Sequence, residues 1–258
     1  MTTAARLVAE ARLAGELLGE LPEECRPASE EDGYQVQRAV HRHLAERGRG
    51  ALAGYKVGCT TRALQEFLGT DHPGAGGVLA SAVHHGSGAF RFQDYRRPGV
   101  ECEVAVVLGE DLTPDRAPFT THGVAAAVAS CAAAIEVVDN RYTDLRALGT
   151  PTLIADDLLA AGCVLGPPAA GFDPQDLREV AGELKVDGQP VGHGSGRDIL
   201  GDPLVALAWL ADTLASQQTT LYAGQFVLLG SVATHWLTAP GEAVATSSPL
   251  GTVSATFA

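Results

Sequence analysis

From residue 77 onward, the chain is a succession of short strand-forming segments that do not alternate regularly with helices. Two helical patterns interrupt them: the Ala-rich stretch 120–133, and the stretch 202–216, where we expect Asp202 to cap the helix and Pro203 to begin it. Strands that outnumber helices in this way favour an α+β fold with a mostly antiparallel or mixed sheet. The predicted strands are 77–83, 100–108, 134–139, 161–166, 183–187, 225–232, 242–246 and 251–257.

The first 75 residues have a different, mainly helical character. Apolar residues recur at helical spacing between Leu7 and Leu18, and a second helix begins near Ser29, a good N-cap, and runs to about Leu44. A short strand around "AGYKVGCT" and a third helix over 61–68 follow. We therefore predict an N-terminal helical cap over 1–75 and a β-rich core over 76–258.

Charge and cysteine usage exclude several classes of partner and compartment. The formal net charge of −13 at pH 7 argues against a nucleic-acid or anionic-membrane surface, because both attract Lys and Arg. The N-terminal stretch carries Glu10 and Glu16 and so lacks the apolar centre of a signal peptide. Five cysteines without a CxxC pair are typical of free thiols in a reducing compartment. We expect a cytoplasmic protein that binds neither nucleic acid nor membrane.

Two carboxylates occupy the predicted strand 100–108. Glu101 and Glu103 are separated by one residue, so an extended chain turns both toward the same face, roughly 7 Å apart. Glu136 is a third carboxylate in apolar surroundings, within "AAAIEVVDN". Three buried glutamates would suit a hard divalent cation such as Mg²⁺ or Mn²⁺. The alternative is that Glu101 and Glu103 face water on an edge strand, and the pattern alone does not decide between the two.

Lys56 is the other unusual charged residue, because it lies in the apolar segment "GYKVG". Of 18 basic residues, only Lys56 and Lys185 are lysines. A lysine in such a place can bind a carboxylate or move a proton. The alternative is a surface lysine whose aliphatic part lies along the strand.

In order, several segments resemble one known family over nearly the whole chain. They are "GYKVGCTTRALQEFLGTDHPGAGGVLA", "VECEVAVVLGEDL", "AAIEVVDNRY", "IADDLLAAGCVLG", "GSGRDILGDPLVALAWLADTL" and "LYAGQFVLLGSVATHWLTAPGE". The family is the 2-keto-4-pentenoate hydratase / 2-oxo-acid decarboxylase group of the fumarylacetoacetase-like superfamily. The resemblance implies a mixed β-sandwich or roll core with an N-terminal helical cap, dependence on Mg²⁺ or Mn²⁺, and homo-oligomers.

The resemblance also implies roles for individual residues. The family's metal carboxylates fall on Glu101, Glu103 and Glu136, and its active-site lysine falls on Lys56. A substrate contact falls on Gly230 and Ser231. We expect a small 2-oxo acid as substrate, and a metal-stabilised enolate as the basis of the chemistry.

Departures from the family pattern leave the reaction open. Hydratases of the group tend to carry an acidic residue where this chain has Gly74, and small polar residues where it has Leu158 and Leu159. We therefore add Gly74 and Leu158 to the predicted substrate site. The first expectation is a 2-keto-4-pentenoate hydratase-like lyase of aromatic catabolism. The alternatives are a 4-oxalocrotonate decarboxylase-like enzyme, which would work in complex with a hydratase, and a biosynthetic cyclase or isomerase for a larger apolar substrate.

Overall fold

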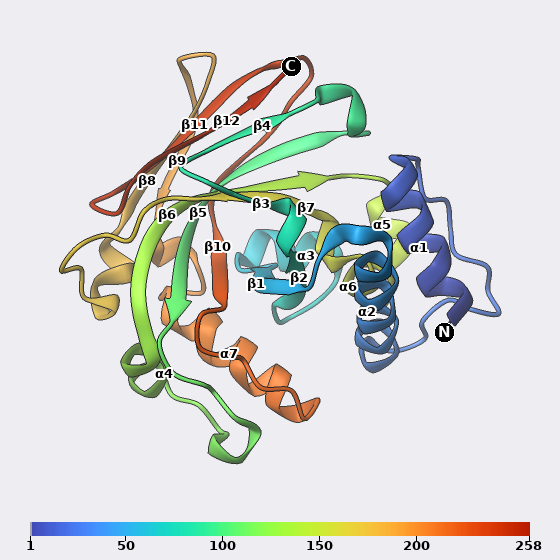
Figure 1. Cartoon of the computed structure of the whole chain (residues 1–258), viewed down its shortest axis with the longest axis horizontal. Helices are drawn as coiled ribbons and strands as arrows, with labels where there is room; N and C mark the ends of the chain where they lie inside the picture. The colour runs from blue at the N-terminus through green and yellow to red at the C-terminus, as the bar shows by residue number, and fades with distance from the viewer. Residues whose placement is uncertain (1) are drawn as a thin grey trace.

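One mixed sheet forms the centre of the molecule in the computed structural model, which describes residues 2–258 (Figure 1). Within those residues the sheet has twelve strands in the order β2-β1-β10-β5-β6-β7-β3-β4-β12-β11-β8-β9. The neighbours β1/β10, β3/β7 and β4/β12 run parallel, and the other pairs are antiparallel. The strands are β1 (Leu52–Gly58), β2 (Gly74–Leu79), β3 (Val83–His85), β4 (Ser87–Phe90), β5 (Pro98–Leu108), β6 (Val128–Asp139), β7 (Ala160–Leu165), β8 (Ala181–Val186), β9 (Gln189–Ser195), β10 (Phe226–Trp236), β11 (Gly241–Ser248) and β12 (Gly251–Phe257).

The sheet curls so that its two halves pack face to face, with β8, β9, β11 and β12 lying across β5, β6 and β10 (Figure 1). The inner faces share one apolar core, to which β5 contributes Val100, Cys102, Val104 and Val106. In β12 the residues alternate between buried and more exposed positions, as a strand with one face on a core must. The expected α+β fold with a mixed β-roll core is confirmed.

Helices cover the outside of this roll. They are α1 (Thr2–Ala14), α2 (Glu30–Leu44), α3 (Arg62–Leu68), α4 (Thr121–Ala127), α5 (Leu145–Leu148), α6 (Thr150–Ala155) and α7 (Pro203–Ser216). In Figure 1, α1, α2 and α6 group on one side of the molecule, where α1 packs on α2 and α2 packs on α6. Helix α7 lies against β10 and α4. Among the described residues, no helix is long and apolar enough to cross a membrane.

The expected helix boundaries hold where side chains cap them. Ser29 caps α2 and forms a reciprocal pair of hydrogen bonds with Asp32, and Asp202 caps α7, which begins at Pro203. The Asp-Gly turn of "VDGQP" joins β8 and β9, with positive φ at both Asp187 and Gly188.

The predicted helix over 120–133 is wrong in its second half. Helix α4 ends at Ala127, and Val128 begins strand β6, whose next residues pair with β5. Alanine has the highest intrinsic preference for helix, but pairing with a buried neighbouring strand outweighs a preference of a few tenths of a kcal/mol per residue. Strand β1 lies within the predicted cap range 1–75, and it pairs with β10 in the central sheet.

Candidate metal and substrate site

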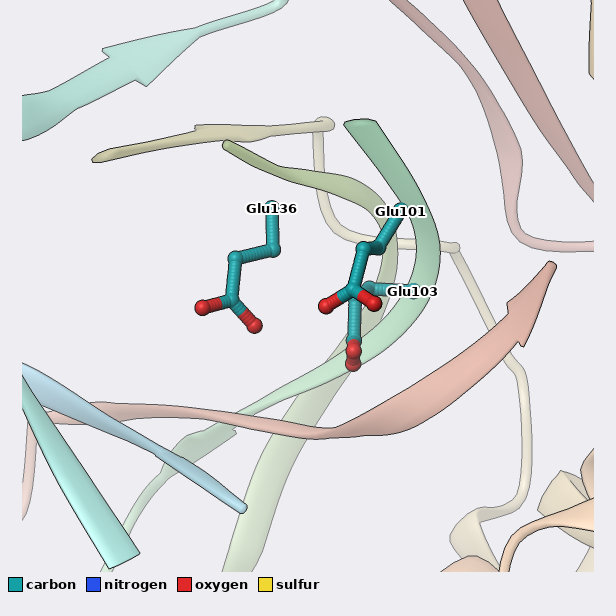
Figure 2. Close-up of side chains that lie close together, drawn as sticks. All are labelled: Glu101, Glu103 and Glu136. Atoms are coloured by element: carbon teal, nitrogen blue, oxygen red, sulfur yellow. The ribbon is translucent and has the colours of Figure 1, made fainter. Parts of the chain in front are cut away.

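Three glutamates converge on one face of the central sheet. Glu101 and Glu103 share a face of β5, and Glu101 lies directly opposite Glu136 in the β5/β6 register. Figure 2 shows the three carboxylates turned into the same space. One oxygen from each carboxylate lies within 4.8 Å of the other two. The structure therefore brings together the three carboxylates that we predicted as metal ligands.

The position of β5 in the sheet rules out the alternative that Glu101 and Glu103 face water on an edge strand. Strand β5 lies between β10 and β6, so it is not an edge of the sheet. The exposed fraction is 1% for both Glu103 and Glu136, while Glu101 is half-buried. Carboxylates at such depth are costly unless hydrogen bonds or a positive charge compensate them.

Two of the glutamates are held by neighbours on β10. The backbone N–H of Gly230 donates to Glu103 Oε2 at 2.8 Å, and the hydroxyl of Thr234 donates to Glu101 Oε1 at 2.7 Å. Gly230 has φ +137°, and a Cβ at this position would lie 2.5 Å from the Thr60 hydroxyl oxygen. A residue larger than glycine would therefore disturb the strand that orients Glu103.

Glu136 has a different partner, the ammonium group of Lys56. Lys56 Nζ lies 3.2 Å from Glu136 Oε1 and donates to the carbonyl oxygen of Leu158 at 3.3 Å. In a flat sheet, β1 and β6 would be about 14 Å apart, because β10 and β5 separate them. The curl of the sheet and the length of the two side chains bring the groups together. Lys56 is only 4% exposed, so the surface-lysine alternative is wrong.

The electrostatics of this cluster follow from burial and from the shortage of cations. Burial raises the pKa of Glu136 to about 8, although Lys56 opposes the shift. Burial, Glu136 and Glu101 raise the pKa of Glu103 well above its ordinary value. Burial would lower the pKa of Lys56, but the attraction of Glu136, Glu101 and Glu103 outweighs it and raises that pKa. When all three carboxylates are ionised, one ammonium leaves two negative charges to be balanced, which is why, together with burial, the pKa values of Glu103 and Glu136 rise in the absence of a further cation.

The donor set fits a divalent cation. Carboxylate oxygens are the ligands that Mg²⁺, Mn²⁺ and Ca²⁺ prefer, and two oxygens on one Mg²⁺ can be at most about 4.2 Å apart. The three glutamate oxygens lie within 4.8 Å of one another, which is close to this limit. Glu136 Oε2 is buried and has no hydrogen-bond partner in the part of the chain that the structure describes. A cation would supply the missing partner and the missing charge.

A cavity of about 790 Å³ opens beside the carboxylates. Lys56, Leu158 and Ser231 line it together with Glu101 and Glu103. Gly230 is not part of this lining, but its backbone N–H donates a hydrogen bond to Glu103. Gly74 lies behind Leu158, since a Cβ at Gly74 would be 2.8 Å from Leu158 Cδ2. Of the predicted substrate residues, Ser231 and Leu158 therefore border the cavity directly.

The turn Asp157–Leu159 forms one wall of this site and has an unusual backbone. Its three residues have φ of +52°, +49° and +71°, in the left-handed region that non-glycine residues rarely adopt. Asp157 holds the turn through its buried carboxylate, which accepts from Arg12 Nη1 at 2.6 Å, from His41 Nε2 at 2.7 Å and from the Gly77 N–H at 2.7 Å. Sequence reasoning missed Arg12 and His41, because they lie 145 and 116 residues from Asp157 and no local spacing links them.

Comparison with known proteins gives a consistent family. The model of the fumarylacetoacetate (FAA) hydrolase C-terminal family matches residues 72–258. The 2-keto-4-pentenoate hydratase of Burkholderia vietnamiensis is 35% identical over 257 residues, covering 98% of this chain and 95% of that protein. The 4-oxalocrotonate decarboxylase of Pseudomonas putida is 29% identical over 232 residues, covering 88% and 84%.

A similar structure is that of 4-oxalocrotonate decarboxylase from Pseudomonas putida G7. Its complex with magnesium and adipate superposes with a TM-score of 0.91 at 25% identity, covering all of this chain and 97% of that one. Its complex with calcium and acetate gives a TM-score of 0.90. Both of these similar structures contain a divalent metal ion.

Proposed function

This chain belongs to the fumarylacetoacetate hydrolase family, and from that premise we propose that it is a divalent-metal-dependent lyase acting on a 2-oxo or 2-hydroxy-dienoic acid. The single observation that supports this most is the set of three converging carboxylates beside a buried lysine and a deep cavity. We propose a hydratase-type reaction, as in the relatives with 35% identity that are named 2-keto-4-pentenoate hydratases.

The metal would be held by Glu101, Glu103 and Glu136. We propose Mg²⁺ or Mn²⁺, since all three ligands are hard carboxylate oxygens. A cation at this place supplies Lewis-acid chemistry, which favours negative charge on the 2-oxygen of the substrate.

Lys56 is the proposed catalytic residue of the protein itself. Its ammonium lies at the boundary between the carboxylates and the cavity, where it can orient the substrate carboxylate or transfer a proton. Ser231 lies on the cavity wall and is a proposed substrate contact, and Gly230 positions Glu103 next to it.

A decarboxylase reaction is the second candidate, and one observation favours it. Leu158 fills the space in front of Gly74, where hydratases of the resembling group tend to carry an acid. Addition of water needs more proton-transfer groups than loss of CO₂ from a 2-oxo diacid does. The absence of this acid therefore favours decarboxylation. A decarboxylase of this kind would be expected to co-purify with a hydratase, and either enzyme is expected to form homo-oligomers in the cytoplasm.

The experiment that tests the function compares two substrates. Purified protein with Mg²⁺ or Mn²⁺ is incubated with 2-hydroxypenta-2,4-dienoate or 2-oxohex-3-enedioate, and the loss of ultraviolet absorbance is followed. Turnover of the first identifies a hydratase, and CO₂ release from the second identifies a decarboxylase. Treatment with EDTA should abolish either activity. Activity that survives complete removal of the metal would contradict the proposal.

A further inference from the structure

The cavity beside the carboxylates is strongly asymmetric in its chemistry. Three of its four charged lining residues, Lys56, Glu101 and Glu103, cluster at the inner end. Most of the remaining wall is apolar. The apolar lining residues are Val57, Ala63, Leu64, Phe67, Leu68, Val138, Leu145, Leu153, Leu158, Leu159, Trp236 and Leu237.

The inner wall next to the reacting groups is also apolar. Leu158 is 8% exposed and packs into the room left by two glycines, since a Cβ at Gly58 would lie 3.1 Å from Leu158 Cδ2 and one at Gly74 only 2.8 Å away. The Leu158 carbonyl accepts from Lys56, so its side chain begins directly beside the ammonium. A substrate that extends from the carboxylates therefore passes from a charged end into an apolar channel.

The outer rim continues this apolar surface into solvent. Leu64, Phe67 and Trp236 are 41%, 42% and 43% exposed, although all three are large apolar side chains. Leu64 and Phe67 come from α3, which has no buried residue, and Trp236 ends β10. Exposed apolar groups that gather at the mouth of a cavity are typical of a ligand-binding site.

The size of the cavity also indicates a substrate larger than a five-carbon acid. At about 790 Å³ it lies in the upper part of the range of roughly 300–1,000 Å³ that buries drug-sized ligands. A five-carbon acid bound at the charged inner end would leave most of this volume open.

We propose that the substrate carries a large apolar substituent, a long alkyl chain or an aryl group, at the end remote from its carboxylate. The inference rests on the proposed function for the position of the 2-oxo acid end. Leu158 and Leu159 contact the near part of the substituent, and Leu64, Phe67 and Trp236 hold its far end. Burial of apolar surface then sets the preference for length.

Arg97, the fourth charged residue of the lining, could favour a different substrate. Its guanidinium donates to the carbonyl oxygen of Tyr142, so one of its donors is already engaged. A terminal carboxylate on the substrate would pair with Arg97, whereas an alkyl or aryl group would pack on Phe67 and Trp236. A diacid of matched length therefore belongs in the test.

The test is a binding series measured by calorimetry on the protein loaded with Mn²⁺. The ligands are straight-chain 2-oxo acids of three to ten carbons, 2-oxo-4-phenylbutanoate, and the 2-oxo diacid of eight carbons. We expect affinity to rise about fourfold for each added methylene until the cavity is filled. We expect the phenyl acid to bind better than the five-carbon acid, and the diacid to bind worse than the eight-carbon monoacid.

Two variants at the cavity rim and one control show which residues cause the rise of affinity with ligand length. In Phe67→Ser and Trp236→Ser, the ratio of the ten-carbon to the five-carbon affinity should fall about tenfold. In Tyr222→Ser, which alters a residue that is 55% exposed and outside the cavity lining, this ratio should not change. Because the ligand series is measured on the unmodified protein, the result does not depend on the folding of any variant.

The outcomes separate this inference from the proposed function. If short 2-oxo acids bind in a metal-dependent way but affinity does not rise with length, the apolar-substituent proposal is wrong and the proposed function stands. Tighter binding of the diacid than of the monoacid would also overturn the proposal. If no 2-oxo acid binds to the metal-loaded protein, the proposed function itself is wrong.

Discussion

Lys56 and Glu136 form the pair on which the chemistry of the site depends. Both side chains are almost fully buried, and their charged atoms are 3.2 Å apart. A buried ion pair contributes little to net stability, because desolvation offsets the attraction between the charges. Its presence at the end of a large cavity is better explained by a role in binding and turnover than by a contribution to folding.

Replacement of Lys56 by Met tests that role. The substitution keeps an unbranched side chain of similar length and removes the ammonium. We expect turnover to fall about 10²- to 10⁴-fold, the usual contribution of a general acid or base, while metal binding persists because all three carboxylates remain. The measurement is steady-state kinetics with saturating Mn²⁺.

The matched control is Lys185→Met, since Lys185 is 42% exposed on β8 and pairs only with Glu183 in the described contacts. Its rate should equal that of the unmodified protein. If Lys56→Met retained full activity, Lys56 would be a structural residue.

At the residue scale, the sequence singled out residues where the pattern was local, and the structure places these residues together in one cluster. Glu101 and Glu103 were found from their spacing on one strand, and Lys56 from its apolar neighbours. Glu136 was grouped with Glu101 and Glu103 from its apolar surroundings, with the edge-strand alternative left open. That Lys56 joins these carboxylates was implied only by the family resemblance. Arg12 and His41 were missed as partners of Asp157, because burial of a distant pair leaves no periodic signal in the sequence.

At the level of elements, the cap helices stabilise the wall of the site. Arg12 comes from α1 and His41 from α2, and both bind the fully buried carboxylate of Asp157. Each non-glycine residue in the left-handed region costs about 1–3 kcal/mol. The turn Asp157–Leu159 is therefore stable only because contacts with the surrounding structure hold it in this conformation. The contacts of Asp157 connect the cap to the position of Leu158 in the cavity.

Asp157→Asn tests this connection through stability. Burial raises the pKa of Asp157, but His41, Arg12 and the Gly77 N–H outweigh it and hold that pKa below its ordinary value. The ionised carboxylate therefore stabilises the fold at pH above about 4, the ordinary carboxyl pKa, and this contribution is lost as pH falls further. Asn has the same shape as Asp but no negative charge to compensate the charge of Arg12. We therefore expect the free energy of unfolding to fall by about 3 kcal/mol at pH 7.

The measurement is the melting temperature of both proteins between pH 3 and pH 8. At neutral pH the variant should melt several degrees lower, and the gap should narrow as the pH falls below 4. Equal melting temperatures at pH 7 would show that the Asp157 contacts do not stabilise the turn.

Element boundaries were predictable where a side chain marks them, as Ser29 and Asp202 do for α2 and α7. They were not predictable inside the Ala-rich stretch 120–133, where α4 changes to β6 at Val128. Alanine is compatible with both structures, and the pairing partner in β5 decides which one forms. The information that sets this boundary is therefore tertiary.

At the scale of the whole molecule, the curl of the sheet builds the site. The register of β5 with β6 places Glu101 opposite Glu136, and the curl brings Lys56 from β1 into contact with them. The fold class and the helical N-terminal region were predictable from the distribution of strands and helices. The closure of the roll was implied only by the family resemblance, because local sequence patterns predict strands but not their order in the sheet.

The central claim is that Glu101, Glu103 and Glu136 bind one divalent cation, and isothermal titration calorimetry of Mn²⁺ into EDTA-stripped, dialysed protein tests it most directly. We expect one site per chain in the unmodified protein, and loss of that site in Glu101→Gln and Glu136→Gln. Glu110→Gln, a control at a side chain that is 67% exposed, should bind as the unmodified protein does. Undiminished Mn²⁺ binding in both Glu101→Gln and Glu136→Gln would contradict the claim.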